Sequence, residues 1–169
     1  MSFKLEELQK IAEKRGREYF MDKRVDCLPA TLLAVNDALK DADDVNYAEP
    51  MVLRASTPLP GGFGVLEAPC GVASAGSLAI GLKYGSDDVY DSSLMADSWG
   101  RSREWMLWVK ESFGSYDCFG LTHGVDFTDP VQGQAYDQGP KRELCNTYLV
   151  EGAKKLVDML TADNKNVTR

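Results

Sequence analysis

The chain has 169 residues, of which 44% are hydrophobic and 27% are charged. This length suits one domain and this composition is typical of globular proteins, which excludes fibrous, disordered and multi-pass membrane chains. Lys and Arg total 19 against 26 Asp and Glu, giving a net charge of -7. An acidic chain repels nucleic-acid phosphates. The one basic cluster, between Lys14 and Arg24, is interleaved with acidic residues, so we expect no nucleic-acid partner.

The sequence also gives no indication of export or of membrane insertion. Glu6 and Glu7 stand where a signal peptide would have its basic start. The longest uncharged stretch that looks helical, 68–82, is rich in Gly and Ser and is shorter than the roughly 18 apolar residues of a membrane span. We therefore expect a cytoplasmic protein without a membrane-inserted segment.

Most segments show the period of an α-helix and not the alternation of a strand. The first predicted helix covers 3–22. The second begins at Asp26 and ends near residue 39, with Asp26 as its N-cap and Pro29 in its first turn. Residues 49–56 could form a short helix or a strand, and we expect the helix.

Residues 68–85 predict a central helix that is buried on all sides. Glu67 is the only charged residue in the 28 residues from 55 to 82, and a helix without charges on any face is buried. Its Gly and Ala residues would allow neighbouring helices to approach closely. We interpret the Gly-rich segment 58–64 as a tight turn that brings Cys70 into the core, since it lacks the Lys-Ser/Thr of a P-loop.

The C-terminal half predicts two more helices. One occupies the second half of 89–113, and its apolar stripe comprises Trp105, Trp108, Val109 and Phe113. The Gly- and Asp-rich segment 115–139 is expected to be mostly loop, and a last helix covers 140–162. Together these elements predict an all-α protein: one compact domain over 1–169, with about five helices packed round the Gly/Ala-rich helix.

The candidates for chemistry are the four cysteines of the chain, Cys27, Cys70, Cys118 and Cys145. They are 43, 48 and 27 residues apart, so the spacing is neither that of a zinc ribbon nor that of a thioredoxin motif. Cys27, Cys70 and Cys145 fall at or near predicted helix starts. The unpaired N–H groups there lower a thiol pKa and favour the thiolate, which binds metals and attacks disulfides. The alternative is that all four thiols are small core residues.

No catalytic residue emerges from the rest of the sequence. His123 is the only histidine, which excludes multi-histidine metal sites and disfavours a Ser-His-Asp triad. Cys118 with His123 would make a nucleophile and a base, but a single His in a Gly-flanked loop is more often incidental.

The order of the cysteines, and the glycine that follows the second of them, resembles the redox-active protein family named for its C_GCAxxG_C_C cysteine pattern: Cys27, Cys70-Gly71, Cys118 and Cys145. The Gly-rich segments 60–64 and 81–85 also fit, and the similarity covers about 26–160. The chain departs from the pattern after Cys70-Gly71, where the second glycine comes one place later, at Gly76.

This resemblance implies a helical domain with a redox role, and it associates the domain with iron–sulfur binding. Four thiolates are the usual ligands of a [2Fe–2S] or [4Fe–4S] cluster, and also of a structural zinc ion. We therefore expect an electron-transfer protein with an iron–sulfur cluster, or zinc, on the four cysteines, and a redox partner protein. Two alternatives stay open: a thiol–disulfide redox protein with transient bridges, and a helical binding module, monomeric or a homo-oligomer, whose cysteines belong to the core.

Overall fold

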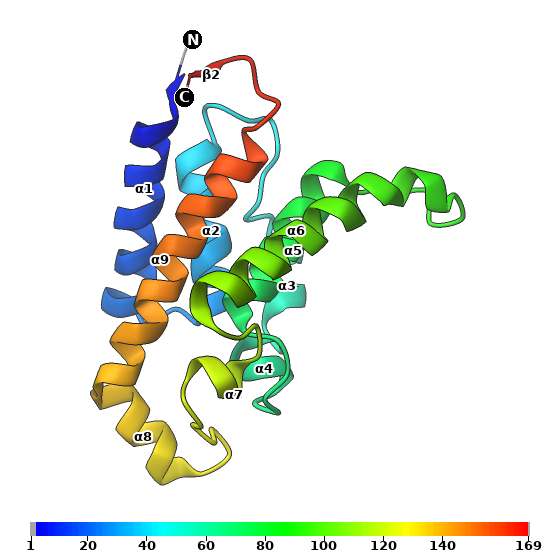
Figure 1. The fold of residues 1–169 in the computed structure, drawn as a ribbon. Helices are drawn as coiled ribbons and strands as arrows, with labels where there is room; N and C mark the ends of the chain where they lie inside the picture. Colours follow the sequence, from blue (N-terminus) through cyan, green and yellow to red (C-terminus); the bar gives the residue numbers. More distant parts are fainter. Residues whose placement is uncertain (1–2, 169) are drawn as a thin grey trace.

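The computed structural model describes residues 3–168 and shows an all-α protein, as predicted (Figure 1). In this part of the chain five helices have thirteen residues or more: α1 (Leu5–Arg17), α2 (Cys27–Leu39), α5 (Gly71–Tyr84), α6 (Ala96–Phe113) and α9 (Pro140–Leu160). None of the described helices is both long and apolar enough to cross a membrane. The predicted domain also includes Met1, Ser2 and Arg169, which lie outside the described residues.

Helices α1, α2 and α9 lie side by side and pack as a three-helix bundle (Figure 1). Their inward faces are apolar and at most 4% exposed, as at Leu8, Ala12, Leu32, Val35, Leu149 and Leu156. Gly16 of α1 allows the closest approach, because a Cβ at this position would lie 2.7 Å from Cδ2 of Leu149. The 3.6-residue spacing of these apolar side chains explains both the helices and their packing.

Helix α5 lies between this bundle and α6. Its buried residues are mostly Gly and Ala, as predicted. The prediction that the helix is buried on all sides is wrong, because Ser74, Ser77 and Leu78 are partly exposed and Leu82 is exposed. Gly76 lets the fully buried Trp105 of α6 lie against the α5 backbone, since an added Cβ would be 2.1 Å from Cε2 of the indole. The indole N–H also donates a hydrogen bond of 2.8 Å to the carbonyl oxygen of Ala73.

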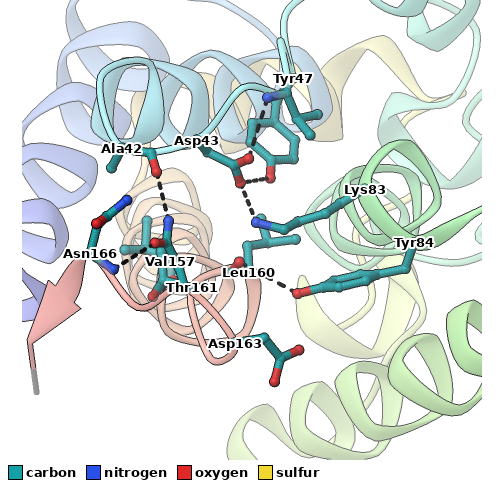
Figure 2. Close-up of polar contacts among 12 residues, drawn as sticks. Ala42, Asp43, Tyr47, Lys83, Tyr84, Val157, Leu160, Thr161, Asp163 and Asn166 are labelled. Atoms are coloured by element: carbon teal, nitrogen blue, oxygen red, sulfur yellow. Dashed lines mark hydrogen bonds and ion pairs between the residues drawn. The ribbon is translucent and has the colours of Figure 1, made fainter.

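The C-terminal ends of α2 and α5 are linked by polar contacts around Asp43 (Figure 2). The Asp43 carboxylate forms an ion pair with Lys83 of α5. It also accepts a hydrogen bond of 2.6 Å from the hydroxyl of the fully buried Tyr47. Close by, the Asn164 amide donates to the carbonyl oxygen of Ala42 at 2.6 Å.

The ends of the chain differ from the prediction. The first helix does not begin at residue 3, because β1 (Phe3–Lys4) pairs in parallel with β2 (Val167–Thr168). Helix α1 then continues into a π-helical turn over Glu18–Asp22. The helix expected in the second half of 89–113 is confirmed as α6, preceded by a 3₁₀ turn over Ser92–Met95.

The short elements gather at the end of the molecule away from the two termini (Figure 1). They are α3 (Pro50–Ser56), α4 (Pro60–Phe63), α7 (Cys118–Leu121) and α8 (Pro130–Gln138). Helix α3 confirms the helix predicted over 49–56.

The prediction that 115–139 is mostly loop is wrong for α7 and α8. Helix α8 begins with Pro130, and its N-cap Asp129 accepts a hydrogen bond of 2.8 Å from the backbone N–H of Val131. Both are ordinary helix-start signals. No residue of α8 is buried, so the segment has no apolar face whose period would reveal it in the sequence.

Candidate four-cysteine site

The four cysteines come from four helical segments at the same end of the molecule. Cys27 is the first residue of α2, Cys70 is the N-cap of α5, and Cys118 is the first residue of α7. Cys145 is the sixth residue of α9, beyond the first turn. Cys27 and Cys70 therefore stand at helix starts as predicted, and Cys145 lies a little over one turn into α9. Cys118 also stands at a helix start, which was not predicted because the four-residue helix α7 was not predicted.

The chain segments before Cys70 and Cys118 hold these two residues together. The backbone N–H of Cys70 donates to the carbonyl oxygen of Tyr116 at 2.8 Å, and that of Cys118 donates to Ala68 at 3.0 Å. The residues just before the two cysteines form an antiparallel bridge. Two positions that are 48 residues apart in the sequence are thereby fixed as neighbours.

All four thiols are free, and each interacts electrostatically with the other three. Cys70 and Cys118 are buried, with 7% of each residue exposed, whereas Cys27 and Cys145 are partly buried. The structure thus brings the four predicted site residues into one group, which we call the four-cysteine site.

Gly71 gives this group the space it needs. A Cβ at Gly71 would lie 2.3 Å from Sγ of Cys27, well inside van der Waals contact. The sulfur of Cys27 therefore rests against the backbone at the start of α5, where only glycine leaves enough room. This contact is a physical reason for the glycine that follows Cys70.

Polar groups of the chain act on three of the thiols. The backbone N–H groups of Gly61 and Leu28 oppose the effect of burial on the pKa of Cys27, and that of Val72 does so for Cys70. The side chain of Tyr136 has the same effect on the pKa of Cys145. Such donor groups favour the negative charge of a thiolate.

The predicted tight turn before Cys70 supplies one of these donors. Its backbone is left-handed at several residues, with φ of 73° at Gly61, 81° at Gly62 and 62° at Val65. A Cβ at Gly62 would lie 2.6 Å from the backbone of Ala68. The turn thus folds closely on the segment that leads to Cys70, and in doing so it presents the Gly61 N–H to Cys27.

Burial dominates the acidity of the thiols. It raises the pKa of Cys27 to about 11 and that of Cys118 to about 12, and it raises the pKa of Cys70 and Cys145 as well. The N–H donors oppose this effect without overcoming it. The predicted lowering of the thiol pKa at helix starts is therefore wrong for the chain without a bound metal, in which the four thiols are protonated at neutral pH.

As a donor set, the four-cysteine site fits an iron–sulfur group. It offers four thiols, backbone donors to two of the sulfurs, and a cradle that a Cβ at Gly71 would fill. Across residues 3–168, however, no three His, Cys, Asp or Glu side chains are arranged as ligands of one metal ion.

A cavity of about 490 Å³ opens beside the site and is lined by Cys118 and Cys145. Tyr136 and Arg142 also line it. The Arg142 guanidinium is held by the carbonyl oxygen of Phe20 at 2.7 Å and stacks over the ring of that residue, 4.4 Å from its centroid. The sequence analysis missed Tyr136 and Arg142, because their placement depends on α8 and on how it packs against α9.

His123 lies apart from this chemistry. It is exposed and does not line the cavity, whereas Cys118 is buried. Its backbone adopts a left-handed φ of 52°, and its carbonyl oxygen accepts a hydrogen bond from Lys141. The geometry offers no support for a Cys118–His123 nucleophile and base.

Comparison with known proteins gives one match. No curated protein and no solved structure matches the chain. The family described as "Putative redox-active protein (C_GCAxxG_C_C)" matches residues 25–159, well over half of the chain and a range that contains all four cysteines. This match and the four-cysteine site agree with the resemblance drawn from the cysteine order. The chain belongs to the C_GCAxxG_C_C protein family.

Proposed function

We propose that the protein transfers electrons through an iron–sulfur cluster held by Cys27, Cys70, Cys118 and Cys145. The observation that carries this proposal is the mutual interaction of all four thiols, which come from four separate helical segments. Cysteines used only to fill a core have no reason to gather at one point. Four thiolates are the usual ligands of a cluster.

The identity of the metal is open to the same test, since four thiolates bind a structural zinc ion as well as a cluster.

The chain's own groups have defined roles in this proposal. When bound, a cluster supplies one-electron redox chemistry. The backbone N–H groups of Gly61, Leu28 and Val72 lower the pKa of Cys27 and Cys70 and so favour the thiolate that binds the iron. Cys70 and Cys118 are buried, whereas the cavity beside Cys118 and Cys145 gives access to the site. A one-electron redox protein is the partner that this chemistry requires.

The test is the iron, zinc and acid-labile sulfide content of protein purified without oxygen, together with its visible spectrum. We expect stoichiometric iron and sulfide in the wild type. We expect their loss in Cys70→Ser, with lower stability, because ligation is coupled to folding. Ser74→Ala, one turn further along α5, is the matched control and should keep its iron. A Cys70→Ser protein with full metal content would overturn the proposal.

A second function, thiol–disulfide exchange, is favoured by one observation: Cys118 and Cys145 line the same cavity. A small-molecule disulfide entering this cavity would be reduced to two thiols, while Cys118 and Cys145 lose two protons and two electrons and form a bridge. Metal-free protein incubated with glutathione disulfide would show this bridge by peptide mass spectrometry. If the wild type contains no metal, forms no bridge and is alkylated slowly at all four thiols, the cysteines belong to the core of a binding module.

A further inference from the structure

Arg142 carries a positive charge that is buried. Only 9% of the residue is exposed, and an Arg is almost never fully buried unless it is paired. Its guanidinium donates from Nη1 to the Asp137 carboxylate at 2.8 Å and from Nη2 to the carbonyl oxygen of Phe20 at 2.7 Å. Its buried Nε has no hydrogen-bond partner in the part of the chain that the structure describes. The guanidinium therefore has more donors than the chain uses.

The two partners of Arg142 differ in how firmly they hold it. The contact with Phe20 combines a hydrogen bond to a backbone carbonyl with stacking over the ring, 4.4 Å from its centroid. The Asp137 side chain, by contrast, is 60% exposed, and an ion pair with an exposed partner contributes little because water competes for the carboxylate. Asp137 can therefore turn into solvent while Arg142 stays in place.

Arg142 is also part of the wall of the cavity beside the four-cysteine site. The volume of about 490 Å³ is within the range of small-molecule sites, roughly 300–1,000 Å³. The wall is more apolar than polar and includes the rings of Phe127 and Tyr136, which meet edge to face with centroids 4.9 Å apart. These dimensions and this lining fit a small molecule with an apolar body.

The charges around the cavity indicate the charge of such a molecule. Arg142 is the one Lys or Arg among the described residues that line it, and Asp26 and Asp137 are the acids. A carboxylate matches the planar fork of the guanidinium and can replace the Asp137 carboxylate without loss of hydrogen bonds. The two Asp side chains would repel a second negative charge, which disfavours dicarboxylates and phosphate monoesters.

We propose that this cavity binds a small monocarboxylate with an apolar, aromatic body, whose carboxylate takes the place of Asp137 on Arg142. The inference goes beyond the proposed redox role and does not depend on whether the four cysteines bind a cluster. Because Cys118 and Cys145 line the same cavity, the bound molecule would also cover the route by which solutes reach these two thiols.

The experiment is equilibrium dialysis of the full chain, as purified without oxygen, against phenylacetate and against phenylacetamide. The two molecules have nearly the same shape, and only phenylacetate is charged. We expect saturable binding of phenylacetate and at least about tenfold weaker binding of phenylacetamide, the scale of hydrogen bonds to charged groups. Equal binding of the two molecules, or no saturable binding of phenylacetate, would overturn the proposal.

Two variants test whether the carboxylate is held by Arg142, and both keep Arg142 itself because it also holds Phe20. Asp137→Asn removes the competing carboxylate, and we expect it to bind phenylacetate about two- to fivefold more tightly, the scale of an exposed ion pair. Glu143→Gln is the matched control, because it makes the same change of charge next to Arg142 in the sequence. Glu143 pairs with Arg17 and does not line the cavity, so this variant should bind phenylacetate like the wild type.

An unchanged affinity of Asp137→Asn, or an equal gain in Glu143→Gln, would overturn the proposed position of the carboxylate. Thermal unfolding of both variants is measured in parallel. Midpoints within a few degrees of the wild type show that a change in affinity is not a change of fold.

Discussion

Because Gly71 has no side chain, the sulfur of Cys27 can lie against the start of α5 in the four-cysteine site. The 2.3 Å that would separate an added Cβ from the sulfur is far shorter than any real contact. Either the start of α5 or Cys27 would have to move to admit a methyl group. Both carry a thiol of the site, since Cys70 is the N-cap of α5.

We therefore expect Gly71→Ala to lower the free energy of unfolding by about 1–3 kcal/mol, as overpacking does, and to lower the iron content. Gly81→Ala, in the same helix, is the matched control, because an added Cβ there meets nothing within 4 Å. It should stabilise the protein by up to about 1 kcal/mol through helix propensity. Urea unfolding of both variants measures the difference. Equal stability of the two would contradict the contact.

Val65 has a side chain that is poorly compatible with its backbone conformation. Its φ of 62° is left-handed, a conformation that is costly for a β-branched residue and that Asn adopts more readily. We expect Val65→Asn to raise the free energy of unfolding by about 1 kcal/mol. Leu66→Asn, at the adjacent exposed position, should not stabilise the protein. A gain for Leu66→Asn as large as that for Val65→Asn would show that strain is not the cause.

Among the helices that contribute a residue to the walls of the site, α8 packs least tightly against the rest of the protein. None of its residues is buried, whereas α9 beside it buries ten. Local opening costs little where few apolar contacts are lost. We expect the amides of α8 to exchange hydrogen much faster than those of α9, as measured by hydrogen-exchange mass spectrometry.

The same features explain how far the sequence predicts this molecule. Helices α2, α5 and α9 follow from their apolar or small-residue patterns, and the prediction of the four cysteines as one site follows from their order and from Gly71. Helices α7 and α8 leave no such pattern, the first because it has four residues and the second because it buries none. Tyr136 was missed with α8. The raised thiol pKa values result from burial among distant segments, which no local pattern reports.

At the scale of the whole molecule, α2 and α5 are joined at both ends. Their N-terminal ends carry Cys27 and Cys70. Near their C-terminal ends, Asp43 pairs with Lys83 and accepts the hydrogen bond of Tyr47 (Figure 2). The Asp43–Lys83 pair therefore connects the two helices at the ends that lie away from Cys27 and Cys70.

The Asp43–Lys83 pair also predicts a dependence of stability on pH. Burial disfavours the Asp43 carboxylate, but the hydrogen bonds from Lys83 and Tyr47 outweigh it, and the pKa of Asp43 is lowered. A carboxyl with a lowered pKa in the folded state stabilises the fold above its unfolded pKa of about 4. That contribution is lost as the pH falls below 4 and through the lowered value.

Asp43→Asn should therefore lower the free energy of unfolding by about 2 kcal/mol at pH 7, the scale of a hydrogen bond to a charged group. Because protonated Asp43 resembles Asn, the gap between this variant and the wild type should close as the pH falls below 4. Asp44→Asn, at the exposed neighbouring position, is the control and should follow the wild type at every pH. Urea unfolding at pH 7, 5 and 3 measures all three proteins. A difference in the free energy of unfolding that is as large at pH 3 as at pH 7 would show that the charge of Asp43 does not stabilise the fold.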